Sequence, residues 1–457
     1  GRHQLVGDGH ALADLDAALS RAEATAREET EADLAGIEAR DPTLGAFQAI
    51  HADAARQAAQ AADAARRSGG RLGPLHGATF ALKDIVDLEG QVTTWGSAAL
   101  AERAAPATGT LARRLLAAGG VLVGKTKTVE CALGGWGTNQ RMGTPWNPCD
   151  EGVHRAPGGS SSGSGVAVAA GMARFAVGTD TGGSVRLPAA FCGIVGLKVT
   201  EGRLPLDGIM PLSHTLDTPG PMTRSVADAA LVFAVMDGAE GTAQARAKAA
   251  RAGLIAEQER GLAGLRLGVL NAQERAGVAP EILDLYDAAA ETLARQGAVP
   301  TPFAPPTSFA ELTARTGRII AAEGFAHHGA LYGDPSKPMD EDVRARMLEG
   351  AKIGAADYVS LLLERPAAKA AFLAAMRGVD AVLTPTAPVP PPPVAEVDQA
   401  ISPGLFTRPV NHHGLCALSV PMGLTTEGLP GGLQIIARPN AEAMALRIGA
   451  AFERAAA

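Results

Sequence analysis

The first part of the chain has the apolar spacing of amphipathic helices. Residues 9–67 are rich in Ala, Glu, Asp and Arg. Their apolar positions recur every three to four residues, which places them on one face of a helix. These positions are Leu12, Leu15, Leu19, Leu34 and Ile37. We therefore expect residues 1–67 to form a helical region that packs against the rest of the chain.

After a Ser-Gly-Gly break at 68–70, short apolar runs alternate with segments of helical spacing. The predicted strands are 78–82, 121–123, 265–270, 381–385, 417–421 and 432–437, and the predicted helices are 110–120 and 281–296. Such alternation is typical of parallel sheets. The sequence thus predicts an α/β fold, an α/β/α sandwich whose central mixed, largely parallel sheet is covered by helices on both faces. Residues 68–457 are predicted to form one large domain.

The composition is that of a globular protein without a nucleic-acid or membrane partner. Hydrophobic residues make up 46% of the 457 residues and charged residues 19%, which supports a large core. The 41 Lys and Arg against 48 Asp and Glu give a net charge of −7, without the basic excess that attracts phosphate backbones. Apolar stretches are interrupted before the roughly 18 residues of a membrane-spanning helix, and the first residues lack a signal-peptide core. We expect a soluble, cytoplasmic protein.

The cysteines give no sign of a metal site. Cys131, Cys149, Cys192 and Cys416 are scattered without a CxxC pair, which disfavours both structural zinc and a disulfide framework. We expect them to be small buried apolar side chains.

Residues 119–126 (GGVLVGKT) match the phosphate-loop pattern GxxxxGK[ST]. A phosphate loop follows a strand and opens a helix, because its N–H groups surround phosphate at the helix N-terminus. Here a helical segment precedes the pattern, and Val-Leu-Val favours a strand. We therefore expect no nucleotide site and interpret Lys125 as an ordinary residue after a strand.

The most informative stretch is 157–203, where two Gly/Ser clusters at 158–165 and 179–184 flank apolar segments. Glycine adopts backbone conformations that other residues resist, so the turn at 180–184 can aim successive N–H groups at one point. That arrangement suits an anion or a developing oxyanion. The alternative, two flexible linkers, fits poorly with the apolar flanks.

A serine in these clusters needs a base before it can act as a nucleophile. Five histidines lie in the N-terminal region or near the glycine clusters without a triad signature: His3, His10, His51, His154 and His214. A Ser-His-Asp triad stays open, because triads form in space. A nucleophile elbow at 163–165 fails, because the second glycine of G-x-S-x-G comes too early.

Lysine is the other candidate base. Lys83 follows the apolar run 78–82, so a strand would carry it into the interior. Burial disfavours the ammonium form and lowers the pKa, which gives a neutral amine able to accept a proton. The alternative for a lysine beside an aspartate is an exposed ion pair, here with Asp84.

Taken together, LKDIVD around Lys83, PGGSSSGSG at 157–165 and GTDTGGSVRLPAAFCGIVGLK at 178–198 resemble the amidase signature family of serine hydrolases. The resemblance extends from about residue 70 through GPLHG, TTWGS, LAAGGVLVGKT, EGRLP, LDTPGPMTRSVADAA, LTPTAP and GLPGGLQIIA. It implies the amidase signature fold and a Ser-cisSer-Lys triad that uses neither metal nor organic cofactor.

By this resemblance Lys83 is the base, Ser160 the bridging serine after a cis peptide bond, and Ser184 the nucleophile. Ser161 and Ser162 are neighbours that compete with Ser160 for the assignment. The implied oxyanion hole consists of the N–H groups of Thr181, Gly182, Gly183 and Ser184. An ion pair between Asp180 and Arg186 is implied to brace the turn.

The predicted substrate contacts come from two other segments. Gly134, Gly135 and Trp136 are expected in a loop over the acyl pocket, and His412 and His413 are expected near the leaving group. The predicted function is hydrolysis of the C–N bond of small amides, including anilides, carbamates or esters, by a bacterial-type enzyme that forms a possible homodimer.

The alternative is the A subunit of a tRNA-dependent amidotransferase. Such proteins commonly have glutamine after the arginine of the nucleophile turn, whereas Leu187 follows Arg186 here.

Overall fold

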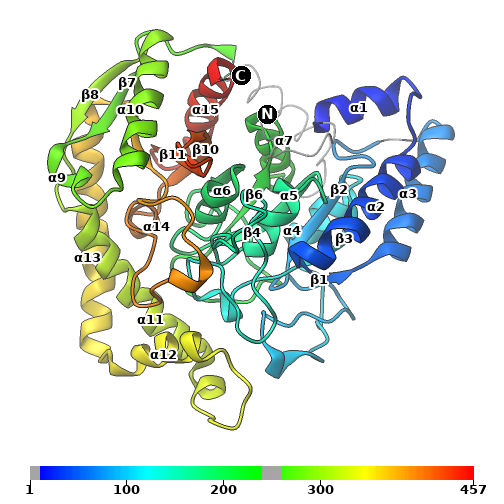
Figure 1. Cartoon of the computed structure of the whole chain (residues 1–457), viewed down its shortest axis with the longest axis horizontal. Helices are drawn as coiled ribbons and strands as arrows, with labels where there is room; N and C mark the ends of the chain where they lie inside the picture. The colour runs from blue at the N-terminus through cyan, green and yellow to red at the C-terminus, as the bar shows by residue number, and fades with distance from the viewer. Residues whose placement is uncertain (1–10, 71, 239–256, 258, 457) are drawn as a thin grey trace.

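The computed structural model describes residues 11–70, 72–238, 257 and 259–456 (Figure 1). The predictions for His3 and His10 fall outside them. The described strands form one 11-stranded sheet in the order β1-β3-β2-β4-β6-β5-β10-β11-β9-β7-β8. They are β1 (Phe47–Ile50), β2 (Thr79–Lys83), β3 (Val121–Thr126), β4 (Phe175–Asp180), β5 (Val195–Lys198), β6 (Thr218–Thr223), β7 (Arg266–Leu270), β8 (Val299–Phe303), β9 (Ala381–Pro385), β10 (Cys416–Leu424) and β11 (Pro430–Ala437).

The sheet is mixed, as predicted, but "largely parallel" describes only two parts of it. Strands β3, β2 and β4 are parallel neighbours, and so are β9, β7 and β8. From β4 through β6, β5, β10 and β11 to β9, every neighbour is antiparallel. Connection length explains part of the difference: a crossover helix joins β2 to β3 and β7 to β8, whereas residues 425–429 allow only a hairpin between β10 and β11.

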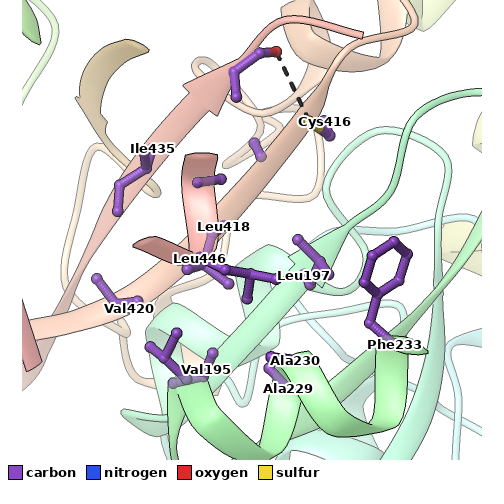
Figure 2. Packing of buried hydrophobic residues seen from close by; sticks show 14 of the residues in the cluster. Val195, Leu197, Ala229, Ala230, Phe233, Cys416, Leu418, Val420, Ile435 and Leu446 are labelled. Carbon is purple, nitrogen blue, oxygen red and sulfur yellow. Dashed lines mark hydrogen bonds between the residues drawn. The ribbon is translucent and has the colours of Figure 1, made fainter. Parts of the chain in front are cut away.

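The helices cover both faces of the sheet, so the predicted three-layer sandwich is confirmed. Alternate residues of one strand enter different apolar clusters: Phe80 and Leu82 join the larger cluster, while Ala81 between them joins the second. The larger cluster includes side chains of β5, β10, β11, α7 and α15, such as Leu197, Leu418 and Ile435 (Figure 2).

Helix α5 packs on the other face of the sheet, the face of the second cluster, against β2, β3 and β4. The described helices are α1 (Leu12–Ser20), α2 (Ala26–Leu44), α3 (Ala52–Arg67), α4 (Thr110–Ala117), α5 (Ser162–Ala169), α6 (Arg186–Cys192), α7 (Val226–Met236), α9 (Ala272–Arg275), α10 (Pro280–Arg295), α11 (Phe309–Tyr332), α12 (Glu341–Glu349), α13 (Ala355–Ala375), α14 (Arg408–His412) and α15 (Glu442–Ala456).

The N-terminal region is not purely helical. Helix α2 ends at Leu44, and the left-handed φ of 59° at the next residue, Gly45, lets the chain turn into β1. Strand β1 pairs antiparallel with β3 and forms one edge of the sheet. A four-residue strand carries little periodic signal, so the helical pattern around it concealed it.

The segment 119–126 contains a strand and no phosphate loop. Helix α4 precedes it, and β3 occupies Val121–Thr126, as predicted for Val-Leu-Val. The interpretation of Lys125 was wrong, because this residue lies inside β3 and is fully buried.

Helices α11, α12 and α13 lie beside the sheet, at the lower left of Figure 1, and follow one another along the chain with no strand between them. They share a third apolar cluster with the loops after β2 and β3. None of the helices in the described part of the chain is long and apolar enough to cross a membrane.

Candidate active site

Lys83 is the last residue of β2, between β3 and β4, and its side chain is fully buried. Its Nζ donates hydrogen bonds to Oγ of Ser160 and to Oγ1 of Thr179, both at 2.7 Å. No carboxylate among the described residues lies within ion-pair distance of Nζ. The amine is therefore solvated by hydroxyls and not by a counterion.

The environment of Lys83 favours a neutral amine. Burial lowers the pKa of Lys83 to about 7, and the negative charges of Asp180 and Asp217 oppose that shift. In a substantial fraction of the molecules the Lys83 amine is therefore uncharged near neutral pH and can accept a proton.

Ser160 lies two residues before α5 and follows a cis peptide bond with Gly159, as the resemblance implies. Glycines are needed where this loop crosses another. Gly158 has a φ of +78°, and a Cβ on Gly159 would come within 2.7 Å of the Gly137 backbone N.

The three neighbouring serines make different contacts. Ser161 Oγ donates to the Thr179 carbonyl and accepts its N–H, both at 3.2 Å, which ties α5 to β4. Ser162 Oγ donates to the Lys127 carbonyl at 3.5 Å. Of the three, only Ser160 contacts the amine of Lys83 among the described hydrogen bonds.

Ser184 lies in the turn between β4 and α6. Its carbonyl accepts the N–H of Ser161 at 3.3 Å, which joins the two Gly/Ser clusters. Ser184 lines a cavity of about 460 Å³ and keeps 8% of its surface exposed. The turn thus presents this serine to the space in which a small ligand fits.

Asp180 holds the turn through a hydrogen bond that takes one donor away from the predicted oxyanion hole. The N–H of Gly183 donates to Asp180 Oδ1 at 2.9 Å, so this donor is engaged within the protein. The N–H groups of Thr181, Gly182 and Ser184 donate to no acceptor in the described part of the chain. Three of the four predicted donors are therefore free for a ligand.

Arg186 pairs with Asp180 through two hydrogen bonds of 2.8 and 2.9 Å, and both side chains are fully buried. It also donates to Asn411 Oδ1 at 2.6 Å and to Gln434 Oε1 at 2.7 Å. Burial opposes ionisation of Asp180, but the charge and hydrogen bonds of Arg186 hold its pKa well below the usual range. The paired ions fix the turn on α14 and β11.

A family model described as Amidase matches residues 28–446. The chain belongs to the amidase signature family.

Similar proteins span nearly the whole of this amidase-family chain. The 2-amino-5-chloromuconic acid deaminase of Comamonas testosteroni is 37% identical over 423 residues, which are 90% of this chain and 89% of that protein. The A subunit of glutamyl-tRNA(Gln) amidotransferase from Myxococcus xanthus is 37% identical over 470 residues, 97% of this chain and 96% of that one. The structure of the peptide amidase from Stenotrophomonas maltophilia superposes with a TM-score of 0.83 at 32% identity, covering 98% of this chain and 97% of the other.

The cavity of this amidase-family protein includes one of the two predicted contact segments. Gly134, Gly135 and Trp136 line it. The indole Nε1 of Trp136 donates to the Ile401 carbonyl at 2.7 Å, which fixes the ring at the wall.

The prediction for His412 and His413 was wrong in its geometry. They do not line the cavity, and both are buried. Their four ring nitrogens find no hydrogen-bond partner in the described part of the chain. Burial lowers the pKa of His412 to about 4 and that of His413 to about 3. Their rings pack in the core, His413 at 4.8 Å from the ring of Phe372 on α13.

The structure does not bring the other described histidines to the cavity either. His51 precedes α3, His154 packs on Trp146, and His214 contacts His327. The open alternative of a Ser-His-Asp triad therefore gains no support.

Sequence reasoning missed several polar residues of the site. Thr179 supplies the second hydroxyl to Lys83, and Asp217 accepts a hydrogen bond of 2.6 Å from the Thr181 hydroxyl. Burial raises the pKa of Asp217 to about 6. Both residues lie inside the quoted segments GTDTGGS and LDTPGP, which was the available signal. Arg346 and Arg408 also line the cavity, and no sequence pattern connects them.

Proposed function

We propose that this amidase hydrolyses the C–N bond of small amides through an acyl-enzyme on Ser184, with a proton relay from Ser184 through Ser160 to Lys83. The observation that carries the proposal is the buried amine of Lys83, which is bonded to Ser160 and lacks a carboxylate partner among the described residues. This arrangement gives a base without histidine.

In the proposed first step, neutral Lys83 accepts the proton of Ser160 while Ser160 accepts that of Ser184, and Ser184 Oγ attacks the amide carbonyl. The proton returns along the same path to the departing nitrogen, whose bond to carbon breaks. Water then attacks the acyl-enzyme with the same base and releases the acid. These steps need no cofactor.

The developing oxyanion is proposed to bind the N–H groups of Thr181, Gly182 and Ser184. That these N–H groups have no acceptor among the described residues supports this role. Because Asp180 and Arg186 hold the turn from the buried side, the donors are oriented before substrate arrives. Preorganised donors of this kind lower the barrier by about 3 kcal/mol each.

The cavity of about 460 Å³ suits small substrates. We propose that these substrates are amides and, by the same chemistry, anilides, carbamates or esters.

A test of the proposed function combines labelling and turnover. A fluorophosphonate is expected to modify Ser184, located by peptide mapping, and the Ser184→Ala variant should escape labelling. A panel of primary amides, p-nitroanilides and aryl carbamates then measures leaving-group preference. Labelling elsewhere, or unchanged turnover by Ser184→Ala, would contradict the proposal.

The second candidate is the A subunit of a tRNA-dependent amidotransferase, which the 37% identity to such a protein over 97% of this chain favours. The two candidates differ in their needs. Turnover by the purified chain alone supports the hydrolase, whereas dependence on co-purifying partner chains and tRNA supports the amidotransferase.

A further inference from the structure

Two arginines line the cavity that contains Ser184. Arg408 is the first residue of α14, and Arg346 lies on α12. They come from segments far apart in the chain, and the charge of Arg346 acts on Arg408 within the same space. Like charges in a small cavity repel each other, so their convergence calls for an explanation.

The guanidinium of Arg408 has no protein partner among the described residues, since its side chain makes neither a hydrogen bond nor an ion pair with any of them. The glycines around it leave it room. A Cβ on Gly182 would lie 3.1 Å from the Arg408 Cγ, and one on Gly317 would lie 2.8 Å from its Nη1. The stem therefore lies on the turn that carries the free N–H groups, and the head lies beside α11.

The hydrogen-bond acceptors of the Arg346 guanidinium in the described part of the chain are neutral. Its guanidinium donates to the Leu133 carbonyl at 2.8 and 3.2 Å and to Gln399 Oε1 at 2.9 Å. Glu349 also lines the cavity, but its carboxylate pairs with Lys352 at 2.6 Å and not with either arginine. No described carboxylate lies at ion-pair distance from either arginine, although the charges of Asp340 and Asp342 act on Arg346 from farther away.

The surroundings of Arg408 lower the pKa of its guanidinium. Burial, and then the charge of Arg346, lower the pKa of Arg408 to about 10. Arg408 still remains fully protonated at neutral pH. Arg408 is only half-buried and lines the cavity, so its guanidinium is open to an anionic ligand that supplies the missing counterion.

We propose that the substrate of this amidase carries a carboxylate in addition to its amide, and that Arg408, assisted by Arg346, binds it. A planar guanidinium matches a planar carboxylate with two parallel hydrogen bonds, which favours this anion. Because the Arg408 stem packs on Gly182, the acid group would lie a few carbon atoms from the amide attacked by Ser184. The inference rests on the proposed hydrolase function and adds the substrate class.

The test uses pairs of substrates that differ only in this charge. Malonamic, succinamic and glutaramic acids are compared with the analogues in which a methyl ketone replaces the carboxylic acid, and ammonia release gives kcat/KM. The wild type is expected to prefer the acid of at least one pair by about 30-fold or more. Arg408→Gln is expected to lower that preference by about 30-fold, the loss of one charge-assisted contact.

Two further variants separate binding from structure. Arg318→Gln is the control, because it also removes one arginine charge, but from a side chain of α11 that is 51% exposed. This variant should keep the wild-type preference for the acid. Arg408→Lys keeps the charge without the planar fork, so its preference should fall between those of wild type and Arg408→Gln.

Binding is also measured without turnover. Calorimetric titration of Ser184→Ala with the preferred acid should show a Kd about 30-fold weaker once Arg408→Gln is added, with no such change for the ketone. Equal hydrolysis of acids and ketones, or an unchanged preference in Arg408→Gln, overturns the inference and leaves the hydrolase proposal standing. Failure on the acids by an enzyme whose Ser184 is labelled also overturns it. If Ser184 is not labelled and nothing is hydrolysed, the hydrolase proposal itself fails.

Discussion

Two lysines at the ends of neighbouring parallel strands have opposite surroundings. Lys83 ends β2 and Lys125 lies near the end of β3, in register with Leu82, and both are fully buried. Lys83 donates to the hydroxyls of Ser160 and Thr179. Lys125 donates to Asp84 Oδ1 at 3.0 Å and to a threonine hydroxyl at 3.2 Å. The same side chain at the same depth is thus neutralised at Lys125 and has no counterion at Lys83 among the residues that the structure describes.

The contrast shows what separates the proposed base from a structural ion. Burial lowers the pKa of both lysines, but for Lys125 the adjacent carboxylate of Asp84 opposes that effect in direct contact. Asp84 follows Lys83 in the sequence and yet pairs with Lys125, so the carboxylate next to the candidate base is already occupied. The predicted alternative, an exposed Lys83–Asp84 ion pair, is therefore wrong.

The strongest test of this contrast replaces the uncompensated lysine. Lys83→Ala is expected to lower kcat/KM for amide hydrolysis by about 10²- to 10⁴-fold, because a general base contributes that much. The fold should persist, since no buried counterion is left behind. Steady-state rates and a thermal melt check both points, and near-normal turnover would remove Lys83 from the mechanism.

The matching substitution in the compensated lysine should act on stability. Lys125→Met leaves Asp84 buried without its cation, and we expect the free energy of unfolding to fall by about 3 kcal/mol or more. Urea denaturation measures this. Adding Asp84→Asn should recover part of the loss because it removes the stranded charge. A variant as stable as wild type would mean that the pair is not what holds this region.

The candidate site could be proposed from the sequence because its groups lie in three short motifs. Strand β2 carries Lys83 inward, and the two Gly/Ser clusters place Ser160 and Ser184 on turns that few other residues could form. Their roles came from the resemblance of these motifs to the amidase signature family, because the residues alone left a Ser-His-Asp triad and the neighbouring serines open.

What the sequence could not predict depends on contacts between distant segments. The partner of Asp84 follows from the register of β2 and β3, which no single stretch encodes. Arg346 and Arg408 line one cavity because α12 and α14 both pack against α11. His412 and His413 looked polar and available, but their burial against α13 is a tertiary result. The antiparallel centre of the sheet was missed because short strands look alike whatever their direction.

The pH profile sharpens the contrast further. With the pKa of Lys83 at about 7, the amine is protonated below that pH and cannot accept a proton. We therefore expect kcat/KM to be level above pH 8 and to fall about tenfold per unit well below pH 7. Lys125 is neutralised by a carboxylate and takes no part in this limb. A profile that stays flat down to pH 5 would contradict the proposed base.

The smallest expected effect comes from the more distant charges around Lys83. Asp217 is ionised above its pKa of about 6, and its negative charge raises the pKa of Lys83. Asp217→Asn removes that charge while an amide oxygen can still accept from Thr181, so the acid limb should move to lower pH with a modest loss at the plateau. Asp237→Asn, which alters a half-exposed ion pair with Arg203, serves as the matched control and should leave the limb in place. A shift to higher pH in Asp217→Asn would show that the carboxylate acts on the amine by a route other than its charge.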